Sequence, residues 1–235
     1  MKVTVGSVFS ESDRNPHWHS LQIKNLNCPH VVYPNCSDSF PGSTVLKRVG
    51  KATGQLGHVE GLNELISYFK TTDSDFYLIL DSDCFPIHNQ WLAKLAAVKN
   101  DVAAIVRYEN LDSFAHPSAF FFKKEVLFKV QFGLNDVQNI TGDKFKEVTS
   151  NIKEFFPLIR TNRWNPHPIM FGIYWNLFYH HGAGSRTPMF RAIHDLKYYK
   201  DLEINNLQES HFKKLVTNPE EYISQLNFEK KRKVL

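Results

Sequence analysis

Cysteine is scarce in this sequence of 235 residues. The three that occur, Cys28, Cys36 and Cys84, form no C-x-x-C pair. An odd number of widely spaced cysteines argues against a disulfide framework. We therefore expect three reduced thiols.

Long apolar runs are missing as well. No window approaches the roughly 20 apolar residues that a helix needs to span a bilayer. Residues 1–9 have a strand pattern and contain neither the long apolar core nor the cleavage site of a signal peptide. These absences lead us to expect a cytoplasmic protein without a transmembrane segment.

A large excess of one charge is also absent. The chain has 28 Lys and Arg against 24 Asp and Glu, a net charge of +4, and its basic residues are dispersed until the block at 230–233. The small surplus favours anionic ligands such as nucleotide diphosphates, or an anionic membrane face. A terminal charge run is usually only solvated. We expect no nucleic-acid partner and leave a peripheral membrane contact open.

The composition that remains is that of a globular domain. Hydrophobic residues make up 42% and aromatic residues 14% of the chain. A chain of this length is sufficient for one α/β unit with a large core. We expect one domain over residues 1–190 and a helical C-terminal extension of it over residues 191–235. The patterns predict strands at 3–9, 30–34, 76–80, 102–106, 120–122 and 173–179 and helices at 17–26, 59–69 and 91–98.

Two acidic residues follow the most apolar of these strands. Residues 76–80 are bulky and apolar, which is typical of a strand buried on both faces. Asp81 and Asp83 come directly after it, and Pro86 ends further strand pairing. Two carboxylates at such a turn can converge on one hard cation, which prefers oxygen ligands. The alternative is a solvated turn, in which Asp and Ser are favoured for local hydrogen bonds.

The order of motifs along the chain favours the cation. An N-C-S loop follows the second strand, a G-H pair precedes a helix, D-S-D follows the buried strand, and H-P-S and H-H-G come later. In this order residues 1–190 resemble the GT-A glycosyltransferases, especially the family 2-like enzymes. The resemblance implies a single Rossmann-like α/β domain with a mostly parallel central sheet. It also implies a hexosyltransferase-like enzyme that uses a nucleotide-diphosphate sugar.

The resemblance further implies the ligands of a divalent cation, Mn²⁺ or Mg²⁺. Asp81 and Asp83 are its D-x-D acids, and a histidine at the end of a late strand supplies a third ligand. We prefer His181 over His180 because His181 adjoins the flexible glycines, although a double histidine at a strand end is often structural. Arg186 is expected to neutralise charge on the leaving diphosphate.

Two loops are expected to contact the nucleoside. Ser7 and Phe9 lie at the carboxyl end of the first strand, where ligands bind in open α/β sheets. The resemblance places Asn35 and Ser37, which follow the second strand, at the base or ribose. A plain loop is an equal alternative for these two residues.

The G-H pair is expected to line the diphosphate. Gly57 and His58 follow a glycine-rich, basic segment and precede a helix. Glycine lets a backbone approach phosphate, and a helix N-terminus favours anions. The segment is no P-loop, because G-x-x-x-x-G-K-[ST] is absent. The resemblance places both residues, with Asp81, at the diphosphate; alternatively His58 only caps the helix.

Three later residues are candidates for the sugar and acceptor cleft. His116 and Ser118 stand at the entrance to the Phe-rich strand, and the resemblance places this segment in the cleft. Trp164, in a proline-rich loop, is suited to stacking on a sugar. The alternative for all three is packing in the core.

A general base is expected near residue 143. Asp143 precedes a helix that the pattern predicts through Phe145 and Val148. In inverting GT-A enzymes a carboxylate in this part of the chain deprotonates the acceptor hydroxyl. The commoner family pattern is an acidic pair, which is missing here, so Asp136 is the alternative.

Taken together, these features predict an inverting, metal-dependent transferase that moves a sugar to a hydroxyl of a glycan, a lipid-linked or a protein acceptor. One alternative is a sugar nucleotidyltransferase. Such an enzyme would carry a glycine-rich, basic loop after the first strand, where this chain has the acidic segment 10–13. Another alternative is a non-catalytic domain that binds nucleotide sugars.

Overall fold

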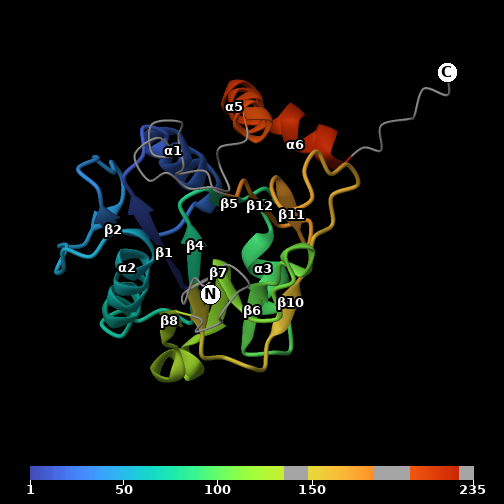
Figure 1. Ribbon diagram of the computed structural model, residues 1–235. Helices are drawn as coiled ribbons and strands as arrows, with labels where there is room; N and C mark the ends of the chain where they lie inside the picture. The colour runs from blue at the N-terminus through green and yellow to red at the C-terminus, as the bar shows by residue number, and fades with distance from the viewer. Residues whose placement is uncertain (135–147, 183–201, 228–235) are drawn as a thin grey trace, which may run out of the picture.

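A seven-stranded sheet forms the centre of the molecule (Figure 1). The computed structural model describes residues 1–134, 148–182 and 202–227. Strand β7 runs antiparallel to both of its neighbours, and the other neighbouring pairs are parallel. The predicted α/β fold with a mostly parallel sheet is therefore confirmed. Across the sheet the strands are β10 (Phe156–Leu158), β6 (Val102–Ile105), β7 (His116–Lys123), β4 (Phe76–Asp81), β1 (Val3–Ser10), β2 (His30–Asn35) and β3 (Thr44–Val45).

Three of the described α-helices lie between strands of the sheets in the chain, and two follow the last described strand. Within the described ranges, no helix is long and apolar enough to cross a membrane. The helices are α1 (Asn15–Leu26), α2 (Gly54–Phe69), α3 (Trp91–Ala96), α5 (Leu202–Thr217) and α6 (Pro219–Asn227), with short 3-10 helices η1 (Tyr108–Asn110) and η2 (Lys124–Lys129).

Strand β4 is buried on both faces, as its apolar run predicts. Tyr77 and Ile79 share one hydrophobic cluster with the inner side of α2. Leu78 and Leu80 share the opposite cluster with α1 and α3. Side chains alternate along a strand, so a strand covered on both faces needs an unbroken apolar run. This packing fixes β4. It brings the polar end of β4 to the side of the sheet where the parallel strands have their carboxyl ends; this side is called the carboxyl edge below.

A second, antiparallel sheet lies at that edge. Its strands, in order, are β11 (Gly172–Tyr174), β12 (Phe178–His180) and β5 (Cys84–Pro86). Since β5 directly follows the D-S-D segment, and His180 pairs with Cys84, the end of β12 is held against the two acids. Two further strands, β8 (Phe132–Leu134) and β9 (Val148–Ser150), form a separate pair.

Two expectations for local structure are wrong. The strand predicted at 173–179 is a hairpin, because the chain reverses at Trp175 and Asn176, whose φ angles are 50° and 52°. Such left-handed backbone is uncommon outside glycine and is not marked in the sequence. Val148, expected in a helix, begins β9, where it pairs with Leu134; residue 145 lies outside the described residues.

The two C-terminal helices belong to the main body. Figure 1 shows α5 and α6 above β5, β12 and β11. Phe212 and Leu215 of α5 and Leu226 of α6 share a hydrophobic cluster with Tyr179 of β12 and Phe9 of β1. The predicted helical C-terminal part is thus confirmed. The expected boundary near residue 190 lies outside the described residues.

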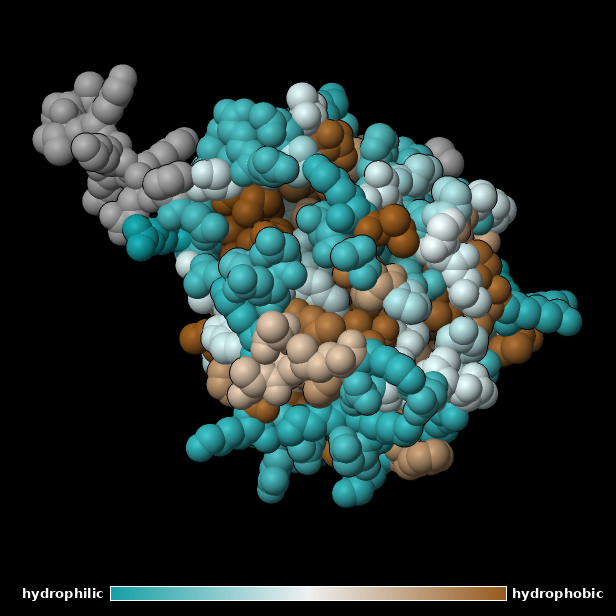
Figure 2. Space-filling model, turned by 180° about the vertical axis from the view of Figure 1, so that it is seen from behind, coloured by the Kyte–Doolittle hydropathy of each residue, from teal (hydrophilic) through white to brown (hydrophobic). Residues whose placement is uncertain are grey.

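The face seen from behind is largely hydrophilic. Figure 2 shows polar side chains spread over it, with hydrophobic residues in separate areas between them. Some large apolar side chains remain exposed, among them Leu111 and Phe128. Singly exposed apolar residues are normal for a globular domain.

Candidate functional site

Three potential metal ligands converge at the carboxyl end of β4. Asp81 is the last residue of this strand, Asp83 precedes β5, and His180 ends β12. One ligand atom from each lies within 4.8 Å of those of the other two. The His180 Nε2 atom is 3.8 Å from Asp81 Oδ2 and 3.5 Å from Asp83 Oδ1. The small antiparallel sheet creates this arrangement by pairing β12 with β5.

Both carboxyl groups are held in the ionised form. Burial alone would raise the pKa of Asp81, but His58, His116 and His180 outweigh it and hold this pKa below its usual range. Burial alone would also raise the pKa of Asp83. His180 again outweighs burial, and the pKa of Asp83 is lowered as well. Two negative charges this close together, one buried at Asp83 and one partly buried at Asp81, favour a bound cation.

Polar side chains surround Asp81 from two other elements. The Ser118 hydroxyl on β7 donates to Asp81 Oδ2 at 2.8 Å and lies 2.5 Å from His116 Nδ1. The His58 Nε2 atom, in the first turns of α2, lies 3.4 Å from Asp81 Oδ1. Apart from this ion pair with His58, the Oδ1 atom has no partner among the described residues. It is therefore available as a metal ligand.

His116 and Ser118, predicted to line the sugar and acceptor cleft, lie against Asp81. Both side chains are buried, and the pairing of β7 with β4 places Ser118 beside Asp81. Burial keeps the pKa of His116 well below its ordinary value. The two residues form a hydrogen-bonded support for Asp81 in this structure.

His181 has quite different surroundings from His180. Its ring is fully buried, lies 5.0 Å from the Trp18 ring and 4.9 Å from the Phe171 ring, and its Nδ1 is 2.8 Å from the Tyr179 hydroxyl. Burial lowers the pKa of His181 to about 3. The preference for His181 rested on the glycines that follow it in the sequence, which carry no information on the direction of a side chain. The structure brings His180 to the two acids instead.

The expected nucleoside contacts fall into two groups. Ser7 and Phe9 are fully buried: Ser7 bonds Gln22, and Phe9 packs on Phe40. Their strand ends at the site, but their side chains point into the packed interior.

The loop after β2 and the start of α2 are joined to each other. Asn35 Nδ2 donates to the Gly57 carbonyl at 2.8 Å. The Asn35 Oδ1 atom is buried without a hydrogen-bond partner among the described residues. Ser37 is exposed. The structure thus brings Asn35, Gly57 and His58 to the edge that carries Asp81.

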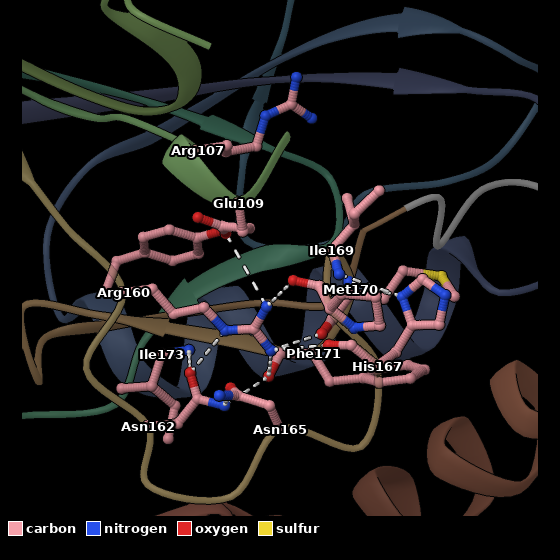
Figure 3. A network of polar contacts seen from close by, with 12 residues as sticks. Arg107, Glu109, Arg160, Asn162, Asn165, His167, Ile169, Met170, Phe171 and Ile173 are labelled. Carbon is pink, nitrogen blue, oxygen red and sulfur yellow. Dashed lines mark hydrogen bonds and ion pairs between the residues drawn. The ribbon is translucent and has the colours of Figure 1, made fainter. Parts of the chain in front are cut away.

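Arg160 fixes the loop that contains Trp164, and Figure 3 shows the Arg160 side chain among residues of this loop. The Arg160 guanidinium donates to the carbonyls of Pro168 and Met170 at 2.6 and 2.8 Å, and also to those of 167 and 171. Trp164 donates its backbone N–H to Leu226 in α6. Its ring packs on His211, so the structure places it between the loop and the C-terminal helices.

Three predicted site residues lie outside the described residues. They are Asp136, Asp143 and Arg186.

The donor set fits a divalent cation. Two carboxylates and one imidazole suit Mn²⁺, and the carboxylates alone also suit Mg²⁺. The set lies outside the carboxyl ends of parallel strands, which is where ligands bind in open α/β sheets. The arrangement can therefore hold a cation together with a phosphate-bearing ligand.

Comparisons with known proteins return solved structures only. No protein-family model matches the chain, and no curated protein matches it in sequence. The mannosyltransferase PcManGT from Pyrobaculum calidifontis, in complex with GDP-Man and Mn²⁺, is 16% identical with a TM-score of 0.41; the match covers 55% of this chain and 46% of that one. TarS from S. aureus is 16% identical with a TM-score of 0.39; the match covers 55% of this chain and 29% of that one.

A third match is glucosyl-3-phosphoglycerate synthase from Mycobacterium tuberculosis in complex with phosphoglyceric acid. It is 12% identical with a TM-score of 0.38, and the match covers 53% of this chain and 57% of that one. The chain thus spans less than two thirds of each of these three proteins. At these values the function has to be argued from the site itself.

Proposed function

We propose that this chain is a GT-A glycosyltransferase that depends on a divalent cation. The observation that carries the proposal is the convergence of Asp81, Asp83 and His180 at the carboxyl edge of the sheet. This edge is where an open α/β sheet binds nucleotides. Two ionised acids and a histidine are a suitable set for a cation that also binds a diphosphate.

The three ligands would hold Mn²⁺ or Mg²⁺. Bound there, the cation would offset the negative charge that develops on a departing nucleoside diphosphate. Ser118 orients the Asp81 carboxylate through its hydrogen bond at 2.8 Å. His58 stands in the first turns of α2, where the N-terminus of a helix favours phosphate oxygens.

The nucleoside would lie along the neighbouring loops. Asn35 is fixed to Gly57 through one end of its amide, and its buried Oδ1 is left as an acceptor for a ligand. Ser37 is exposed on the same loop, and Arg186 would add positive charge at the diphosphate.

The reaction would be a displacement at the anomeric carbon by an acceptor hydroxyl. Asp143, or alternatively Asp136, would take the proton from that hydroxyl in an inverting reaction. The acceptor would be a glycan, a lipid-linked or a protein hydroxyl. A cytoplasmic location is part of the same proposal.

The first test removes one acid from the cation. Asp83→Asn should abolish both Mn²⁺-dependent binding of nucleotide sugars and release of nucleoside diphosphate. The reason is that an amide, unlike a carboxylate, has no negative charge to attract the cation. A panel of nucleotide sugars, assayed by thermal shift and by diphosphate release with Mn²⁺ or chelator, measures both effects.

Asp75→Asn is the matched control. Asp75 is an exposed acid just before the other end of β4, where it accepts from the Lys2 N–H. This variant should behave like the wild-type protein. Donor turnover that persists with Asp83→Asn, or in chelator, would overturn the proposal. Release of pyrophosphate from a nucleoside triphosphate and a sugar phosphate would instead indicate a nucleotidyltransferase.

A further inference from the structure

A single buried side chain holds the backbone of the D-S-D segment. Gln22 lies on α1 and is fully buried. Its Nε2 atom donates to the carbonyl of Asp81 at 2.9 Å and to that of Cys84 at 2.8 Å, and it lies 3.3 Å from the carbonyl of Ser82. One amide group from a distant helix therefore contacts the backbone on both sides of Asp83.

The amide gives these carbonyls hydrogen-bond partners. They belong to the tight connection between β4 and β5, where a buried carbonyl without a partner costs about 1–3 kcal/mol. Because the contacts are to the backbone, they restrict the direction in which the acids at 81 and 83 point. The restraint comes from another element and is present without a ligand.

The orientation of the amide is itself determined by a chain of hydrogen bonds. Ser7 donates to Gln22 Oε1 at 3.1 Å. Since a hydroxyl has one hydrogen, Ser7 must then accept from His30 Nε2, which is also 3.1 Å away. His30 Nδ1 is left as an acceptor for the Ser43 hydroxyl at 2.8 Å, and Ser43 accepts from His19 Nε2 at 2.7 Å.

In this series of hydrogen bonds, from Ser7 to His19, each donor has one acceptor. The pattern requires His30 to be neutral. Burial, with a further contribution from His19, lowers the pKa of His30 to about 3. An amide turned by 180° would place its oxygen against three carbonyl oxygens and its NH₂ group against the Ser7 hydroxyl. This series of hydrogen bonds therefore keeps the Gln22 NH₂ group directed at the D-S-D segment.

We propose that Gln22 is a positioning residue that presets the backbone of residues 81–84 so that Asp81 and Asp83 converge with His180 on the cation. The inference rests on the proposed metal site and adds a residue that does not touch the cation. Residues that orient metal ligands from outside typically contribute 10–100-fold to metal affinity.

The experiment measures Mn²⁺ binding directly, without a donor or turnover. Gln22→Met keeps the length of the side chain and removes both donors. We expect its Mn²⁺ dissociation constant, from calorimetry and from the electron paramagnetic resonance signal of free Mn²⁺, to rise roughly tenfold or more. Gln22→Glu should show a similar or larger rise, because a carboxylate cannot donate to the three carbonyls.

Asn25→Met is the matched control on the same helix. Asn25 donates to the Leu21 carbonyl one turn back, within α1, and has no hydrogen bond to Asp81, Asp83 or His180 among the described residues. It should bind Mn²⁺ like the wild-type protein. Circular dichroism and thermal melting in chelator check that each variant is folded.

Ser7→Ala covers the case in which the Gln22 variants do not fold. It leaves the amide in place but removes the bond that orients it, so a smaller rise in the same direction is expected. Wild-type affinity in the folded Gln22 variants, or in Ser7→Ala where those do not fold, would overturn the inference and leave the metal site intact. A wild-type protein that binds no Mn²⁺ would overturn the metal site, and the role of Gln22 with it.

Discussion

Two neighbouring histidines at the end of β12 have opposite surroundings. His180 faces the carboxylates of Asp81 and Asp83. His181 is enclosed by aromatic rings that include Trp18 and Phe171. Consecutive residues near a strand point to opposite sides. One ring is therefore suited to a metal and the other to packing.

This difference predicts opposite effects of two alanine substitutions. His180→Ala should raise the Mn²⁺ dissociation constant at least as much as the loss of an outer positioning residue does, which is roughly 10–100-fold, with a small effect on folding. His181→Ala should leave Mn²⁺ affinity close to that of the wild type and lower the free energy of unfolding by about 2–4 kcal/mol, since it leaves a cavity among packed rings. Calorimetric titration and urea denaturation measure the two quantities. The reverse pattern would support His181, the ligand that its sequence neighbours favour.

At the scale of residues, the sequence shows which side chains are able to bind a metal better than it shows which way each side chain points. The D-x-D acids are visible because two carboxylates directly follow a buried strand. The choice between His180 and His181 depends on the register of β12 against β5, which no local pattern records. Gln22 gives only a weak signal, a polar residue on the buried side of a helix, because its partners lie some sixty residues away.

At the scale of elements, the C-terminal helices are tied to the body through a buried histidine. His211 on α5 lies 2.8 Å from the Tyr222 hydroxyl on α6, and its ring stacks on Phe171 at 4.4 Å. Burial, with a further contribution from Lys214, lowers the pKa of His211 to about 4. The packing of α5 and α6 therefore requires a neutral imidazole.

This requirement predicts a loss of stability in mild acid. A histidine in the unfolded chain binds its proton near pH 6.5, whereas His211 in the folded chain binds it near pH 4. Between these values the unfolded state holds more protons, so the free energy of unfolding falls as the pH falls, by up to about 1.4 kcal/mol per pH unit for this group. Urea denaturation at several pH values in chelator measures the slope.

The control variant is His211→Gln, which can still bond Tyr222 and does not titrate. Its free energy of unfolding should depend less steeply on pH between 6.5 and 4, by about one proton. An unchanged slope would show that His211 does not couple acid to the packing of these helices.

Elements differ in how visible they are in the sequence. Strands β1, β2 and β4 are predictable because each carries its own apolar pattern. The hairpin of β11 and β12 was predicted as one strand, since its turn uses Trp175 and Asn176 rather than glycine. The loop after β10 is ordered by Arg160, whose bonds to four carbonyls and ion pair with Glu109 join segments that are separate in the chain.

At the scale of the molecule, the proposed general base lies in the segment between β8 and β9, outside the described residues. Strand β8 follows η2, whose first residue, Lys124, donates its N–H to the Asp75 carbonyl at the amino end of β4. From there the chain reaches Phe132, which packs on Phe120 in β7. Leu134 and Val148 thus pair at the end of the β8 and β9 strand pair that is away from η2. Residues 135–147, which include both candidate bases, follow from this end.

The last prediction is that transfer inverts the anomeric configuration and depends on Asp143. An inverting reaction needs a base for the acceptor hydroxyl, and the acids placed at the site, Asp81 and Asp83, are both assigned to the cation. Asp143→Asn should therefore lower transfer to the acceptor by roughly 10²–10⁴-fold. Mn²⁺ and donor binding should be unchanged, because the proposal assigns Asp143 to the acceptor hydroxyl alone. Proton NMR of the product and a single-turnover assay measure configuration and rate.

Asp136→Asn is the paired variant within the same segment. If it loses transfer while Asp143→Asn keeps it, Asp136 is the base and inversion still holds. Near-normal transfer by both variants would remove the segment from proton abstraction. A product with retained configuration would go further, because such a reaction needs no base at the acceptor. The proposed cation site, which serves the leaving diphosphate in either stereochemistry, would then remain without an inverting mechanism.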